Sequence, residues 1–206
     1  MTQRGRFIVI EGGDGAGKSR LQAALAAHLQ ARGRDVLATR EPGGTPLGEQ
    51  VRGLLLAQRA LDDPLAELLL FEAARAHLVS TVIRPALARG ADVICDRFAA
   101  SSVAYQGFGR GLGRDLVDLL NAVATDGLIP DLTLLLDLPV EVGLARRAGD
   151  GESDHFDREA LAFHERVRAG FLAQARDAGD AWRVVDATQP FDDVAPQAAA
   201  AVDAIV

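Results

Sequence analysis

The stretch GGDGAGKS, from Gly12 to Ser19, holds the residues with the clearest chemical purpose in the chain. It fits the pattern G-x-x-x-x-G-K-[ST], with Gly12 and Gly17 as its glycines and Lys18 before the final serine. Glycines allow successive backbone N–H groups to turn inward around a polyphosphate. The lysine adds positive charge near the β- and γ-phosphates, and the serine hydroxyl is a ligand for Mg²⁺. This phosphate loop predicts binding of a nucleoside triphosphate, through residues Gly12, Gly13, Asp14, Gly15, Ala16, Gly17, Lys18 and Ser19.

Lys18 favours a phosphate loop over the alternative, a glycine-rich turn that merely joins a strand to a helix. It is the only lysine among 22 basic residues, so every other basic position is arginine. A compact ammonium group enters a nest of backbone N–H groups where a planar guanidinium does not fit well. The same count excludes a guanine-reading switch protein, because the N-K-x-D motif that reads guanine would need a second lysine.

Sequence patterns on either side of the loop predict a strand before it and a helix after it. The apolar run Phe7–Ile10 leads into it, and Leu21, Leu25 and Leu29 then share one face of a helix. Four further apolar runs alternate with helical patterns, at 35–39, 92–95, 132–136 and 182–185. This alternation predicts a three-layer α/β/α fold of the P-loop NTP hydrolase type, with a five-stranded parallel sheet and helices on both faces.

Charged residues follow two of these strands, at the edge where a parallel sheet places its ligands. Arg40 and Glu41 follow one strand in the sequence TREPGGT, and Asp96 and Arg97 follow another. A second, phosphate-bearing ligand would therefore lie at this edge, beside the phosphate loop. Phosphoryl transfer depends mainly on positioning and on charge neutralisation, so arginines at this edge indicate a phosphotransferase. The candidates are Arg40, Arg75, Arg97, Arg110, Arg114, Arg146 and Arg147.

The composition limits the classes of protein that fit. The 206 residues suffice for one domain, and the net charge of -7 disfavours a motor ATPase or a surface for a nucleic-acid backbone. No stretch approaches the ~20 apolar residues of a membrane span, and no signal-peptide pattern precedes the first strand. Cys95 is the only cysteine, which fits a reducing compartment. We expect a single domain, over residues 1–206, in the cytoplasm.

The longest helical pattern begins at Asp63 and runs towards Gly90. Its apolar residues cover more than one face, which is more than packing on a sheet requires. We therefore expect a homodimer interface through the helix around 65–84, with burial inside the monomer as the open alternative. Pro85 predicts a kink or an early end just before it.

The second half of the chain alternates loops with helices. Glycines at every second position from 107 to 113 favour a mobile loop over much of 101–114, after a short helical piece. A helical pattern from 140 to 147 is interrupted by GDGESD at 149–154, and helical spacing resumes over 157–178.

These segments, taken in order, resemble the bacterial type of thymidylate kinase. The similar stretches cover nearly the whole chain and read EGGDGAGKS, TREPGGTPLGE, FEAARAHL, CDRF, SSVAYQGFGRG, PDLTLLLDLPVEVGL and DATQP. The resemblance implies transfer of the γ-phosphate of Mg-ATP to thymidine monophosphate (dTMP), giving dTDP and ADP for dTTP synthesis. It implies the nucleotides dTMP and ATP as partners, and neither a nucleic acid nor a membrane. Another P-loop nucleoside monophosphate kinase is the alternative.

The resemblance implies roles around the acceptor phosphate and the metal. Arg97 would hold the phosphate of dTMP, and Arg40 would lie nearby, with Glu41 next to it as a further substrate-binding residue. Ser19 would bind Mg²⁺, with Asp14 and Asp96 as the two candidate carboxylates that orient the ion, directly or through water.

The resemblance also implies how the base and the sugar are read. Phe71 would stack on the thymine and Arg75 would donate to its O4. Arginine only donates hydrogen bonds, so it suits this carbonyl and would oppose the amino group of cytosine. Ser102 and Gln106 would meet the remaining polar edge, and Tyr105 would lie against the sugar and disfavour a 2′-hydroxyl.

One position in the loop departs from part of the family. Some members carry an arginine there, whereas this chain has Gly15, like relatives that supply the arginine from a mobile lid. The lid would be 146–157, where His155 stands at a position in which arginine is common. Arg146 or Arg147 is then the group that stabilises the transition state. The candidate catalytic residues are Lys18, Arg97, Arg146 and Arg147.

Overall fold

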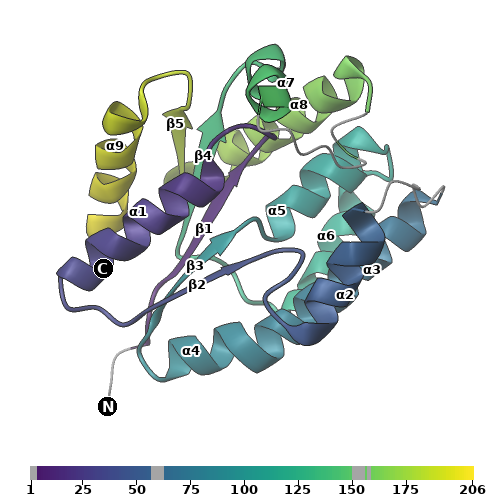
Figure 1. The fold of residues 1–206 in the computed structure, drawn as a ribbon. Helices are drawn as coiled ribbons and strands as arrows, with labels where there is room; N and C mark the ends of the chain where they lie inside the picture. Colours follow the sequence, from purple (N-terminus) through teal and green to yellow (C-terminus); the bar gives the residue numbers. More distant parts are fainter. Residues whose placement is uncertain (1–3, 57–62, 150–155, 157–158) are drawn as a thin grey trace.

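A computed structural model describes residues 4–56, 63–149, 156 and 159–206. Its five strands form one parallel sheet in the order β2-β3-β1-β4-β5, which confirms the predicted five-stranded parallel sheet (Figure 1). The strands are β1 (Phe7–Gly12), β2 (Val36–Arg40), β3 (Asp92–Asp96), β4 (Leu132–Asp137) and β5 (Trp182–Asp186). The phosphate loop follows the central strand β1, so it lies at the middle of the sheet's carboxyl edge.

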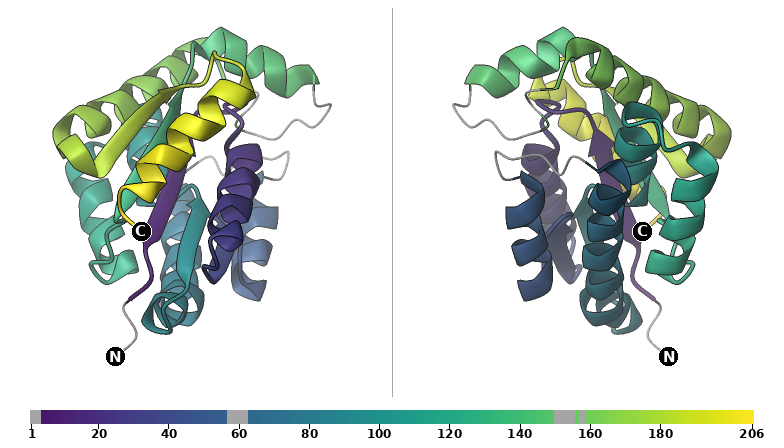
Figure 2. Two further views of the ribbon diagram at one scale, coloured as in Figure 1. Left: turned by 90° about the vertical axis from the view of Figure 1, so that its left-hand side faces the viewer. Right: turned by 90° about the vertical axis from the view of Figure 1, so that its right-hand side faces the viewer.

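Helices cover both faces of the sheet, as Figures 1 and 2 show. Helices α1 and α9 lie on one face, and α3, α4 and α8 lie on the other. The α-helices are α1 (Lys18–Ala31), α2 (Pro46–Leu56), α3 (Pro64–Leu78), α4 (Arg84–Ala88), α5 (Ala99–Ser102), α6 (Arg114–Thr125), α7 (Val140–Gly149), α8 (Leu161–Ala178) and α9 (Phe191–Asp203). A 3-10 turn, Gly179–Ala181, precedes β5.

The alternation of side chains along β1 explains the two cores. Ile8 and Ile10 are fully buried among residues of α1 and α9, whereas Phe7 and Val9 pack against the side of α3 and α4. A central parallel strand is covered on both faces, so it is apolar at successive positions. This rigid strand holds the start of the phosphate loop.

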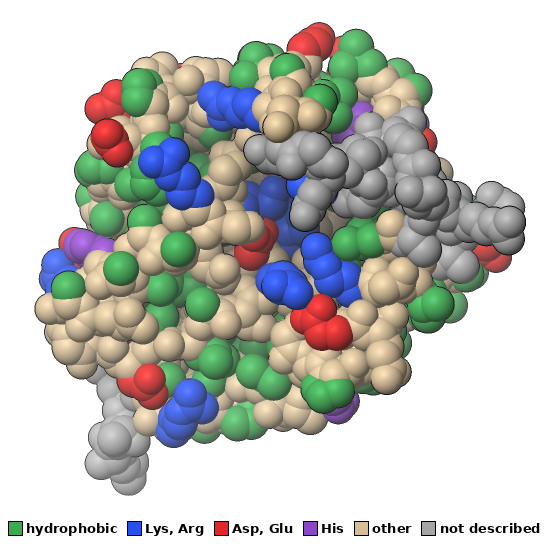
Figure 3. Space-filling view, in the orientation of Figure 1, with side chains coloured by type: hydrophobic (Ala, Val, Ile, Leu, Met, Phe, Trp, Pro, Cys, Tyr) green, Lys and Arg blue, Asp and Glu red, His purple; other side chains and the backbone are tan. Residues whose placement is uncertain are grey.

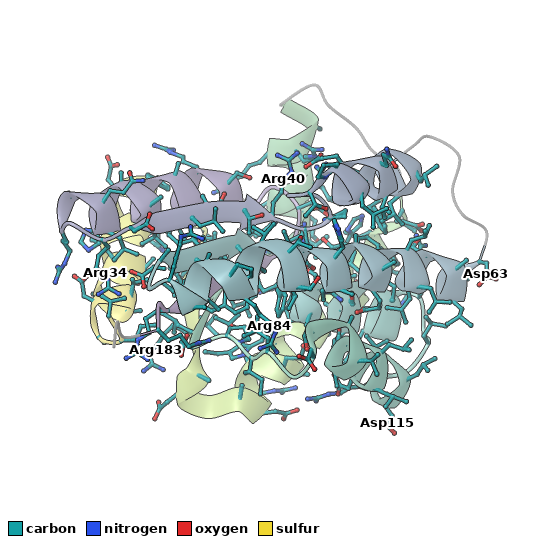
Figure 4. The ribbon with its side chains drawn as sticks, turned by 90° about the horizontal axis from the view of Figure 1, so that it is seen from below. Arg34, Arg40, Asp63, Arg84, Asp115 and Arg183 are labelled. Atoms are coloured by element: carbon teal, nitrogen blue, oxygen red, sulfur yellow. The ribbon has the colours of Figure 1, made fainter. Side chains whose placement is uncertain are left out.

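Helix α3 begins where the sequence predicts. The Asp63 carboxylate accepts hydrogen bonds from the backbone N–H groups of Leu65 and Ala66, at 2.9 and 3.2 Å, and Pro64 follows the cap. Figure 4 shows Asp63 at one end of this long helical element and Arg84 towards the other.

The interruption predicted before Pro85 takes the form of a π-helical turn, Val79–Ile83, between α3 and α4. Proline lacks an N–H group, and its ring crowds the carbonyl one turn earlier. A π-helical turn adds a residue to the turn and so absorbs this mismatch while the chain stays helical.

The loop predicted over much of 101–114 is wrong for residues 103–109, which form a second π-helical segment, Val103–Gly109, directly after α5. Gly109 in this segment serves close packing. A Cβ atom added at Gly109 would lie 2.7 Å from the ring of Phe163 in α8, so only glycine allows the two helical segments this separation.

The predicted helix over 157–178 corresponds to α8, which begins at Leu161. Residues 157–158, and the lid positions 150–155, lie outside the described residues. None of the described helices combines the length and the apolar character that a membrane span requires.

Helix α3 divides its apolar residues between the inside and the surface. Leu68 and Leu78 are fully buried, whereas Leu65 and Leu69 are 41% and 48% exposed. Leu119 of the neighbouring helix α6 is 62% exposed. The homodimer interface on this side stays a prediction.

Candidate active site

A cleft of about 440 Å³ opens at the carboxyl edge of the sheet, beside the phosphate loop. Figure 3 shows this face, where lysine and arginine side chains gather with acidic ones around a central hollow. The cleft unites residues from β2, β3, α3, the Val103–Gly109 segment and α7. It is lined by Asp14, Gly15, Gly17, Lys18, Ser19, Arg20, Arg40, Glu41, Pro42, Arg52, Leu56, Phe71, Asp96, Arg97, Ser101, Ser102, Tyr105, Gln106, Arg147 and Phe156.

The phosphate loop is held by its own lysine. Lys18 Nζ donates to the carbonyl oxygens of Gly12 and Gly13, at 3.1 and 2.7 Å. Burial, together with the nearby charge of Arg97, lowers the pKa of Lys18 to about 8. Gly12 and Gly17 have φ values of 143° and 88°, a region that L side chains rarely adopt. The loop thus keeps a buried ammonium group at the point where a polyphosphate would lie.

Ser19 and Asp96 form a pair beside the lysine. The Ser19 hydroxyl donates to a carboxylate oxygen of Asp96 at 2.7 Å. The two residues come from the start of α1 and the end of β3, which the sheet places next to each other. A hydroxyl next to one carboxylate is the protein part of a typical magnesium site in P-loop enzymes.

Arg97 crosses from the end of β3 to the phosphate loop. Its guanidinium donates to Asp14 Oδ1 at 2.5 Å and to the Gly12 carbonyl at 3.1 Å. The backbone of Arg97 has φ 69°, an uncommon value for a residue with a side chain and one that clusters at functional sites. Arg97 lines the cleft as predicted, with its charge directed at the loop.

Asp14 accepts from two directions. Asp14 Oδ1 accepts a hydrogen bond from the Arg97 guanidinium, and Asp14 Oδ2 accepts one from the Tyr105 hydroxyl at 2.8 Å. Burial opposes ionisation of the Asp14 carboxyl, but the charges of Arg97 and Lys18 prevail and lower its pKa. Burial also raises the pKa of Tyr105, so this phenol stays a hydrogen-bond donor.

Glu11 supports this arrangement from behind the cleft. Its carboxylate accepts from the backbone N–H of Phe98 at 2.9 Å and from the hydroxyl of Ser101 at 2.6 Å. Burial raises the pKa of Glu11 despite these bonds. Glu11 therefore fixes the turn that carries Arg97, a role that the sequence did not reveal because the residue belongs to an apolar strand.

Aromatic rings form one wall of the cleft. Phe71 of α3 lies 6.3 Å from Phe156, and Tyr105 meets the same ring edge-on at 5.7 Å. Gln106 lines the cleft and donates to Glu67 at 2.8 Å, and Ser102 lies beside it. Four residues predicted for the base and sugar therefore share one wall.

Arg75 lies behind this wall and is only 1% exposed. Its guanidinium donates to Glu41 at 2.8 Å, to Glu72 at 2.6 Å and to Ser102 at 3.1 Å. It also donates to Asn121 at 2.7 Å. Arg75 thus holds two cleft residues in place, and its predicted contact with a base carbonyl stays a prediction.

The loop after β2 brings Arg40 and Glu41 to the cleft. Arg40 pairs with Glu49 at 3.1 Å, and both side chains are about half exposed. Glu41 is 5% exposed, and one of its oxygens has no hydrogen-bond partner. Burial raises its pKa to about 7, although Arg75 opposes the shift.

The two adjacent arginines of α7 lie in different places. Arg147 lines the cleft that contains Lys18. Arg146 does not, and donates instead to the carbonyl of Ala187, after β5, at 2.9 Å. Successive helical residues point about 100° apart, so only one of the two can face the phosphate loop.

Several cleft residues were not predicted. Arg52 of α2 is the most notable because it adds a further positive charge. Its helix starts directly after the TREPGGT loop, so its place at the sheet edge could have suggested it. The others include Arg20, Pro42, Leu56, Ser101 and Phe156.

Comparisons with known proteins agree with one another. A family model described as thymidylate kinase matches residues 10–198. The thymidylate kinase of Cereibacter sphaeroides is 54% identical over 209 residues, covering 98% of this chain and 96% of that one. The thymidylate kinase of Thermosynechococcus vestitus is 52% identical over 201 residues, covering 92% and 83%. The crystal structure of thymidylate kinase from Ehrlichia chaffeensis has a TM-score of 0.74 at 36% identity, covering 89% and 87%.

Proposed function

The chain belongs to the thymidylate kinase family of phosphotransferases, and from this premise we propose that it transfers the γ-phosphate of Mg-ATP to dTMP, giving dTDP and ADP. One observation supports the proposal most directly. A single cleft contains the phosphate loop with Lys18 and, next to that loop, a second cationic group at Arg97. Two phosphate-bearing ligands can therefore meet there, which is what phosphoryl transfer requires.

We assign the donor phosphates to the backbone of the phosphate loop and to Lys18. The acceptor phosphate then lies at Arg97, with Arg40 at the cleft entrance as a further positive charge. A phosphate at Arg97 would replace Asp14 as the partner of that guanidinium. Arginine suits this role because its fork of donors matches phosphate oxygens.

We assign the metal to Ser19 and Asp96. Their 2.7 Å contact brings a hydroxyl and a carboxylate together next to the donor phosphates, and Mg²⁺ accepts such a small set of protein ligands beside phosphate and water. Bound Mg²⁺ would neutralise charge on the phosphates. Asp14, the other candidate, directs both of its oxygens at Arg97 and Tyr105, which favours Asp96.

We place thymine against Phe71, with its polar edge towards Ser102 and Gln106 and the sugar towards Tyr105. Arg75 reaches this edge through Ser102, to which it donates at 3.1 Å. The O4 contact of thymine is assigned to this Arg75–Ser102 pair. Because Arg75 donates to the Ser102 hydroxyl from behind, the hydroxyl proton is left to face the base, so the amino group of cytosine would meet a donor and be rejected.

Residues 146–157 are proposed as the lid, and Arg147 as its catalytic arginine. Arg147 lines the cleft, whereas Arg146 is bonded to Ala187 on the far side of α7. An arginine beside the transferred phosphoryl group stabilises the charge of the transition state. We also propose a homodimer through the helix around 65–84, supported by exposed Leu65 and Leu69.

An acceptor panel tests the assignment. The protein is incubated with Mg-ATP and the monophosphates of thymidine, deoxyuridine, deoxycytidine, deoxyguanosine and adenosine, while ADP release is followed. We expect dTMP to be turned over fastest and the cytidine nucleotide to be rejected. Faster turnover of any other acceptor would support a different nucleoside monophosphate kinase.

A further inference from the structure

The first turn of α7 lies directly against the backbone of the phosphate loop, through one glycine on each side. A Cβ atom added at Gly15 would lie within 3.0 Å of the backbone of Gly143. A Cβ atom added at Gly143 would lie within 3.0 Å of the Asp14 carbonyl oxygen. Real Cβ atoms essentially never approach other atoms so closely, so the two segments can touch only because both positions are glycine.

Gly143 has no conformational reason to be glycine. Its φ lies outside the left-handed region, in contrast to Gly15 with φ 71°. Glycine within a helix costs about 1 kcal/mol relative to alanine, so it weakens α7 locally. Gly143 is also the buried residue of α7. The close approach to the loop is the feature that only glycine permits.

The contact between Gly143 and the phosphate loop also affects the position of Arg147, because both residues belong to the same helix. Residues four apart lie on the same face of a helix, one turn from each other. The face of α7 that carries Gly143 against the loop therefore carries Arg147 into the cleft. On another side of the helix, Arg146 is bonded to the Ala187 carbonyl at 2.9 Å, which fixes the rotation of α7 about its axis.

We propose that Gly143 is the positioning residue for Arg147, and that its missing side chain sets the distance between this arginine and the donor phosphates. The inference rests on the proposed function of Arg147 and extends it to the base of the lid. It also accounts for Gly15, since the loop position that would carry an arginine in some relatives is covered here by α7. In this chain the backbone of α7 contacts the phosphate loop where an arginine side chain would otherwise lie. The catalytic arginine is therefore supplied by α7, at Arg147.

The substitution Gly143→Ala tests this directly. The added methyl group must push α7 away from Asp14 by several tenths of an ångström. Misplacement of about 1 Å at a reacting centre costs about 100-fold. We expect kcat to fall at least tenfold, with the KM for dTMP changed less than threefold. Gly53→Ala is the matched control, because it adds a methyl group to an exposed helical glycine with nothing within 4 Å.

A double-substitution cycle separates positioning from a structural effect. If Gly143 acts through Arg147, Gly143→Ala lowers kcat less than threefold when Arg147→Ala is already present. Equal losses in both backgrounds would overturn the inference while leaving the role of Arg147 intact. A mild effect of Arg147→Ala alone would overturn both that role and the inference.

Amide hydrogen exchange on the unsubstituted protein gives a second readout, which holds even if Gly143→Ala does not fold. Docking on the loop predicts slow exchange of the amides of Leu144 and Arg147 without nucleotide, comparable to the amides of α1. Fast exchange there that slows only when nucleotide binds would overturn the inference.

Discussion

The carboxylate of Asp14 holds the guanidinium of Arg97 at 2.5 Å, and this pair joins the phosphate loop to the end of β3. The two side chains are less than one-fifth exposed, so water screens their attraction only in part. An acceptor phosphate would take the place of Asp14 at the same guanidinium. Under the proposed assignment, binding of dTMP would exchange one anionic partner of Arg97 for another.

The first prediction concerns this exchange. Arg97→Gln keeps hydrogen-bond donors but removes the charge, and a charge-assisted hydrogen bond contributes about 1.5–3 kcal/mol. We expect the Kd for dTMP, measured by calorimetric titration without ATP, to rise roughly 10- to 100-fold. Arg40→Gln is the comparison. Its guanidinium is half exposed and already paired with Glu49, so its effect should be several-fold smaller. Equal effects would contradict the assignment of the acceptor phosphate to Arg97.

Much of this site was predictable because its signals are local. The phosphate loop is a contiguous motif, and the apolar strands bring Ser19 and Asp96 to one edge once a parallel sheet is assumed. The carboxyl-edge rule then predicts Arg40, Arg97 and the loop at that edge, and the structure has them around a single cleft. These features need no knowledge of side-chain directions.

Other features depend on packing and were not predictable. Arg146 and Arg147 are equivalent in sequence, and only the rotation of α7 separates them. Gly109 is part of a glycine-rich stretch that suggests a loop, although its packing on α8 makes it helical. The burial of Arg75 follows from Glu41 and Asn121, which come from two distant segments.

The second prediction concerns Glu41 and pH. Burial raises its pKa from 4.5 to about 7, so between these values the native state holds a proton that the unfolded state has lost. The stability that this proton provides is complete below pH 4.5 and is lost as the pH rises through about 7. Glu41→Gln should reduce the fall in the free energy of unfolding between pH 4.5 and about 7. At pH 8 the variant should be as stable as the parent protein or more so, because Glu72 remains as the partner of Arg75.

Thermal unfolding between pH 5 and pH 8 measures this effect as the change in Tm. Glu49→Gln is the control, since Glu49 is exposed and its pKa is lowered by the Gly44 N–H and by Arg40. That substitution should leave the downward slope between pH 5 and pH 7 in place. An unchanged slope in Glu41→Gln would show that another group causes it.

The third prediction is proton uptake when nucleotide binds. The pKa of Lys18 is about 8 in the free protein, and a polyphosphate favours the charged ammonium and raises it. At pH 8.5 the free ammonium is about one-quarter charged, so binding should take up roughly 0.7 proton. At pH 7 the uptake should be roughly 0.1 proton, because Lys18 is already charged.

Calorimetry of Mg-ATP binding in buffers of different ionisation enthalpy measures this number. Lys18→Met should remove the uptake at pH 8.5 and abolish turnover while the protein stays folded. Uptake that persists in Lys18→Met would mean that a different group titrates. Equal uptake at pH 7 and pH 8.5 in the parent protein would contradict the lowered pKa.

The fourth prediction distinguishes Arg146 from Arg147. Arg147 lines the cleft with Lys18 and Arg97, so Arg147→Ala should lower kcat by about 10³-fold, the effect of losing an arginine finger. Arg146 is bonded to the Ala187 carbonyl on another side of α7, and Arg146→Ala should lower kcat less than tenfold. Arg146→Ala should also keep the Kd for dTMP, because Arg146 does not line the cleft that contains the proposed acceptor site. Arg147→Lys keeps the charge but loses the planar fork of donors, so its kcat should lie between those of the parent and Arg147→Ala.

Single-turnover rates with both substrates saturating isolate the chemical step. A larger loss for Arg146→Ala than for Arg147→Ala would reverse the assignment.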